Sequence, residues 1–170
     1  MKPLIAATAL LVLISPALAI AQSPPSAEMR DSAVAFLRTQ RFIVGRLARD
    51  CLETIGSKES PRSILEKWDK DNAKYVAAVD KYWAARLEDI QAESGAAARE
   101  ERDTVLYVTV ERNGTKNVGA ILAQGDKVEV CKAAMTSIES GKMDVENMAK
   151  EQKMPVFGAI DDLVEWAKTH

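Results

Sequence analysis

The chain has 170 residues, with 23 Lys or Arg against 25 Asp or Glu, so its formal net charge is −2. Nucleic acids and anionic lipid surfaces recruit strongly basic proteins, so this mildly acidic, mixed composition argues against either as the main partner. The length permits one domain with a hydrophobic core and leaves little room for a second.

Residues 1–21 have the layout of a secretory signal peptide. Lys2 supplies a positive charge, an apolar run follows from Leu4 to Ile14, and two overlapping small-x-small sites end at Ala21. This order of features predicts cleavage after Ala21. The apolar run is too short to span a bilayer, so we expect no transmembrane segment in the mature chain.

The segment after the signal peptide contains Pro24-Pro25, and we expect residues 22–27 to form a flexible lead-in to a single domain over 28–170. No cysteine lies near the cleavage site, so the chain lacks a lipid-attachment point of the bacterial lipoprotein kind. These features predict a periplasmic protein, with full secretion as the alternative.

The two cysteines predict a structural disulfide. Cys51 and Cys131 are far apart in the chain, which excludes a C-x-x-C redox or zinc motif. An exported protein folds in an oxidising compartment, where an even number of cysteines is typical of paired thiols. Closing so long a loop stabilises a fold by about 4–5 kcal/mol on the chain-entropy estimate.

Apolar residues at three- and four-residue steps predict two long helices in the first half of the domain. The first covers about 28–55 and ends at Gly56, a residue typical of left-handed caps. The second begins at Ser60-Pro61, an N-cap serine followed by proline at the first helical position. Its apolar stripe continues to Ser94-Gly95, which predicts one helix on the order of 50 Å long.

The segment 97–124 has two interpretations. Thr104–Val110 is rich in β-branched residues and Asn113-Gly114 is a hairpin-turn signal, which together favour two strands. A two-stranded ribbon without a larger sheet is only marginally stable, so we favour a helix with a weak point near Gly114. The apolar stripe of that helix would consist of Val105, Val108, Thr115, Val118 and Leu122.

Three shorter helices complete the prediction. Asp126 and Glu129 resemble a capping box, and Gly141 ends the helix that they begin. A short helix near 144–152 and a last helix from Val156 to Lys168 follow. We therefore predict an all-α fold: a single-domain antiparallel bundle of about four main helices plus a short connecting helix, with the disulfide Cys51–Cys131 between two of them.

Residues suited to catalysis are scarce. The single histidine is His170 at the chain terminus, so we expect no catalytic triad, no metal site and no cofactor. Glu93-Ser94-Gly95 resembles the catalytic tripeptide of lytic transglycosylases, which are helical exported enzymes. The same tripeptide recurs at Glu139-Ser140-Gly141, and the Gly- and Gln-containing motif that follows in those enzymes is absent, so both copies are interpreted as helix ends.

The second predicted helix carries the best candidate for a functional surface. Trp68, Tyr75 and Tyr82 recur at seven-residue steps, and Trp83 lies beside the last of them. This aromatic ladder is either core between packed helices or a surface for a partner or ligand, because Trp and Tyr are enriched at binding sites.

Three functions stay open at this level. The first is a non-catalytic interaction protein of the inhibitor, immunity or adaptor type that binds an envelope or secreted protein through a helix face, and it predicts an exposed apolar patch around Trp68–Trp83. The second is a carrier of a small apolar ligand, which predicts an enclosed cavity beside the same rings. The third and weakest is a glycan-active enzyme of the envelope, which requires two carboxylates in one cleft.

Overall fold

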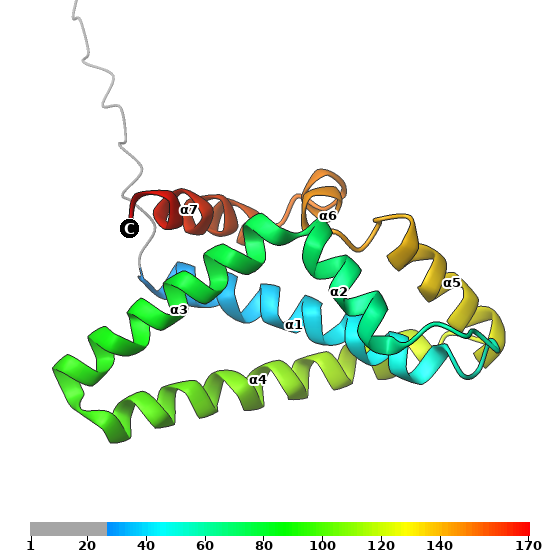
Figure 1. The fold of residues 1–170 in the computed structure, drawn as a ribbon, viewed down its shortest axis with the longest axis horizontal. Coiled ribbons are helices and arrows are strands. Elements are labelled where there is room, and N and C mark those ends of the chain that lie inside the picture. Colours follow the sequence, from blue (N-terminus) through cyan, green and yellow to red (C-terminus); the bar gives the residue numbers. More distant parts are fainter. Residues whose placement is uncertain (1–26) are drawn as a thin grey trace, which may run out of the picture.

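The computed structural model describes residues 27–170, which contain seven helices and no strand (Figure 1). The helices are α1 (Ala27–Cys51), α2 (Pro61–Asp71), α3 (Ala73–Ser94), α4 (Ala96–Leu122), α5 (Lys127–Glu139), α6 (Val145–Glu151) and α7 (Val156–Thr169). The all-α prediction is confirmed. The predicted signal peptide and nearly all of the predicted lead-in lie outside the described residues.

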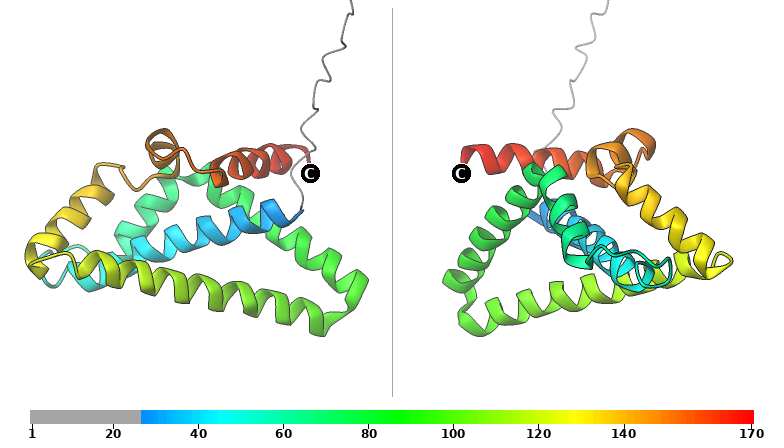
Figure 2. Two further views of the ribbon diagram at one scale, coloured as in Figure 1. Left: turned by 180° about the vertical axis from the view of Figure 1, so that it is seen from behind. Right: turned by 45° about the vertical axis from the view of Figure 1, so that its right-hand side comes forward.

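Helix α1 is the central element of the bundle. It packs against α2, α3, α4, α5 and α7, and Figure 2 shows it enclosed between α4 on one side and α7 on the other. Its apolar stripe is wide enough to face several neighbours, and all of its core residues are almost fully buried: Ala33, Val34, Leu37, Ile43, Val44, Leu47, Ala48 and Cys51.

The predicted disulfide is confirmed. Cys51 and Cys131 are bonded with their Cα atoms 5.0 Å apart, and both side chains are fully buried. Cys51 is the last residue of α1 and Cys131 lies in the first half of α5, so the bond fixes α5 at the C-terminal end of the central helix. A disulfide of this kind fits an extracytoplasmic protein.

The long second helix of the prediction is wrong at Asn72, where the chain turns sharply from α2 into α3 (Figure 1). The Asn72 side chain is buried and fully hydrogen-bonded: Nδ2 donates to Trp68 O (2.9 Å) and Asp144 Oδ1 (3.0 Å), and Oδ1 accepts from Val145 N (2.9 Å). These bonds join the α2–α3 corner to the start of α6. Apolar periodicity continues through the corner, which is why the sequence pattern missed the break.

We expect Asn72→Ala to lower the free energy of unfolding by roughly 2–3 kcal/mol, because it leaves buried polar groups without partners. Urea denaturation followed by circular dichroism measures the change. Asn117→Ala is the matched control, since Asn117 is exposed on α4 and its replacement changes stability by less than about 0.5 kcal/mol. Equal stabilities of the two variants would contradict the assigned role of Asn72.

Helix α4 is continuous, so the preferred helical interpretation of 97–124 is confirmed. The predicted stripe is right only in part: Val118 is buried and Leu122 packs against the core, whereas Thr115 is exposed. Val105 and Val108 are 49% and 50% exposed. The inward face consists instead of residues at four-residue steps: Leu106, Val110, Gly114 and Val118. Packing against α1 selects this face, and β-branched composition alone did not reveal it.

Gly114 is a point of close approach between helices rather than a weak point in α4. A Cβ atom placed on Gly114 would lie 2.2 Å from Cδ1 of Phe42 on α1. The contact requires a residue without a side chain, and tertiary packing therefore outweighs the low helix propensity of glycine.

Gly114→Ala is expected to lower stability by about 1–2 kcal/mol, because overpacking against Phe42 exceeds the gain in helix propensity. Gly119→Ala lies on the same helix with nothing near its Cβ position, so it should raise stability by about 0.5–1 kcal/mol. Thermal unfolding of both variants shows whether each substitution raises or lowers the stability. A stabilised Gly114→Ala variant would show that Phe42 moves aside at no cost.

The remaining helix ends follow the predicted signals. Asp126 Oδ1 accepts hydrogen bonds from Val128 N (3.0 Å) and Glu129 N (3.1 Å) and so caps α5. Gly56 and Gly141 have φ of 67° and 73°, the left-handed conformation predicted for both. Gly141 follows α5 as expected, but α1 ends at Cys51, before the predicted end near residue 55, and turns connect it to Gly56. Within residues 27–170, no helix combines the length and the apolar character needed to cross a membrane.

Candidate binding groove

The aromatic ladder does not form an exposed patch. Exposure of the four side chains is between 3 and 7%: Trp68, Tyr75, Tyr82 and Trp83 all belong to the core. The corner at Asn72 separates Trp68 on α2 from the other three on α3. Trp68 and Tyr75 reach the edge of a surface groove, whereas Tyr82 and Trp83 do not line it.

Tyr82 and Trp83 have their polar atoms satisfied inside the protein. The Tyr82 hydroxyl donates to Asp31 Oδ1 (2.9 Å), and Trp83 Nε1 donates to Asp103 Oδ1 (2.7 Å). Burial, followed by the bond to Asp31, raises the pKa of Tyr82 far above its ordinary value. Arg102 also donates to Asp31 (2.5 Å), so this cluster joins α1, α3 and α4 and has a structural role.

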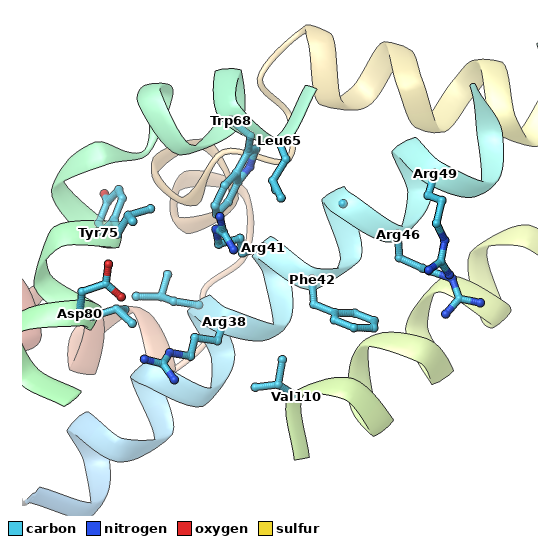
Figure 3. Close-up of a pocket in the computed structure, with 14 residues that line it drawn as sticks. Arg38, Arg41, Phe42, Arg46, Arg49, Leu65, Trp68, Tyr75, Asp80 and Val110 are labelled. Carbon is cyan, nitrogen blue, oxygen red and sulfur yellow. The ribbon is translucent and has the colours of Figure 1, made fainter. Parts of the chain in front are cut away.

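The groove has a volume of about 680 Å³ and lies between α1 on one side and the α2–α3 corner on the other, with α4 at its edge (Figure 3). Most of its lining is apolar, with Leu37 and Phe42 from α1, Leu65 and Trp68 from α2, and Tyr75 and Val79 from α3. Gly45 on α1 widens it, since a Cβ there would already touch Leu65 at 3.5 Å.

Four arginines of α1 border this apolar lining: Arg38, Arg41, Arg46 and Arg49. Arg41 forms a two-bond pair with Asp69 of α2, with Nε and Nη2 both 2.7 Å from the carboxylate oxygens. The bond to Asp69 raises the pKa of Arg41, and the pair connects α1 to α2 beside the groove.

Arg46 and Arg49 share one carboxylate, Asp50. Their Nε atoms lie 2.7 Å and 3.1 Å from its two oxygens. Partial burial acts to raise the pKa of Asp50, but the bonds from the two arginines outweigh it, and the pKa is lowered. One carboxylate thus compensates one of the two positive charges at this end of the groove.

Arg38 differs from the other three. Within residues 27–170 it makes no hydrogen bond and no ion pair shorter than 4.0 Å, and its guanidinium carbon lies 5.7 Å from the centre of the Trp83 ring. Burial lowers the pKa of Arg38, while the charges of Asp80 and Asp103 oppose the shift. Figure 3 shows Arg38 and Asp80 at the end of the groove opposite to Arg46 and Arg49.

Few of the groove's lining residues carry acid–base groups. Asp80 is the one carboxylate among the residues that line the groove, whereas glycoside hydrolysis of the usual kind requires two. In the part of the chain that the structure describes, no three His, Cys, Asp or Glu side chains are grouped in a way that would hold a metal ion.

Sequence reasoning identified Trp68 and Tyr75 but missed the arginines. A partial signal was present, because Arg38, Arg41 and Arg49 lie with Gly45 at three- and four-residue steps beside the apolar stripe of α1, and Arg46 follows Gly45. Only the packed structure places them opposite α2 and α3.

Comparison with known proteins assigns no family. No family model, curated protein or solved structure matches the chain.

Proposed function

We propose that this chain is a non-catalytic binding protein that holds a small amphipathic ligand in the groove between α1 and the α2–α3 corner. The observation that supports this function is a groove of about 680 Å³ with a mainly apolar lining and a few polar side chains at its rim. Small-molecule sites in proteins typically have this volume and this combination of surfaces.

The groove changes the carrier hypothesis in one respect. A carrier of a purely apolar ligand was expected to have an enclosed cavity in the bundle core, whereas this groove opens at the surface beside charged side chains (Figure 3). A ligand with an apolar body and a polar end satisfies both surfaces, because its apolar part leaves water and its polar part does not.

The hypothesis of a protein partner predicted an exposed apolar patch around Trp68–Trp83, and these aromatic side chains do not form one. Trp68, Tyr75, Tyr82 and Trp83 are buried, so they supply no exposed anchor for a partner. Binding of an envelope protein stays a prediction that capture from envelope extract tests. We place the protein in the periplasm, with secretion as the alternative, on the strength of the predicted signal peptide and the disulfide.

The test uses N-phenyl-1-naphthylamine, an uncharged dye whose fluorescence rises in apolar surroundings. We expect saturable binding of one dye per chain. Gly45→Leu should weaken it about tenfold or more, because the new side chain projects into the groove toward Leu65.

Gly119→Leu is the matched control, since it makes the same change at an exposed helical glycine with open space around it. It should bind the dye like the unmodified protein. Dye binding that does not saturate, or that is the same in both variants, would refute the groove as the binding site. Circular dichroism verifies that both variants retain their helices.

A further inference from the structure

The positive charges beside the groove are not equivalent. Arg41 is neutralised by Asp69, and Arg46 and Arg49 are bonded to Asp50. Arg38 has the Trp83 ring nearby and feels the charges of Asp80 and Asp103, but among the described residues no carboxylate is bonded to it. One guanidinium is thus left with its donors available at one end of an apolar groove.

A guanidinium remains charged at neutral pH even when burial disfavours the charge. Holding it partly out of water without a bonded anion costs free energy, which an incoming anion would recover. Its planar set of N–H donors matches the two oxygens of a carboxylate, with which it forms paired hydrogen bonds.

We infer that the natural ligand is a monocarboxylate with an apolar body, and that its carboxylate binds Arg38 while its apolar body lies toward Phe42 and Leu65. This inference rests on the proposed function and adds the ligand class and its orientation. Asp80 lies at the same end of the groove (Figure 3). Its negative charge disfavours head groups of higher charge, such as a phosphate dianion.

Displacement of the bound dye by ligands of one chain length tests the inference. Decanoate and decyltrimethylammonium are used below their micelle-forming concentrations and decan-1-ol below its limit of solubility in water. Decanoate should displace the dye at about 10- to 100-fold lower concentration than decan-1-ol, and the cation should be weakest, because charge-assisted hydrogen bonds add affinity of this order.

Arg38→Gln should remove that advantage, raising the concentration of decanoate needed about 10- to 100-fold and leaving decan-1-ol unchanged. Arg62→Gln is the matched control, because Arg62 is exposed on α2, lies outside the groove and pairs with Glu66. Arg38→Lys keeps the charge without the planar pair of donors, so it should recover part of the affinity for decanoate. This variant also tests the inference if Arg38→Gln folds poorly.

Two outcomes would overturn the inference. Equal displacement by decanoate and decan-1-ol, or equal effects of Arg38→Gln and Arg62→Gln on decanoate, would show that Arg38 does not select a carboxylate. Either result leaves the groove itself intact as a binding site. Failure of the groove is recognised separately, by dye binding that Gly45→Leu does not weaken.

Discussion

The burial of α1 against five neighbouring helices is the constraint on which the rest of the structure depends. Its apolar stripe supplies much of the core, and Cys51 at its end is bonded to α5. The side of α1 outside this stripe carries the four arginines that line the groove. A helix that served only as surface would present such side chains to open water, whereas here they border apolar residues from α2 and α3.

The groove exists because the chain bends at Asn72. A straight helix in place of α2 and α3 could not position Leu65 and Trp68 on one side of the corner and Tyr75 and Val79 on the other, all against α1. The buried amide of Asn72 ties this corner to Asp144 and Val145. One polar side chain in the core therefore helps to set the shape of the apolar groove on either side of it.

Local signals predicted much of the fold. The caps at Asp126 and Gly141 and the disulfide depend on neighbouring residues or on compartment chemistry, and all are confirmed. The break at Asn72 and the inward face of α4 depend on which helices pack together. The apolar periodicity of a single helix therefore cannot predict them. The candidate site was likewise predicted in part. Trp68 and Tyr75 were identified because they are aromatic, whereas the surroundings of Arg38 are set by Trp83 and Asp80 on another helix, α3.

The disulfide joins residues separated by 80 positions, and the covalent ring that it closes contains α2, α3 and α4. The wall of the groove opposite α1 is therefore part of that ring. Once oxidised, even the unfolded chain keeps the end of α1 beside the start of α5, so less entropy is lost when the ring segments fold back onto α1. With the disulfide reduced the ring is open, and folding of the groove lacks this stabilisation.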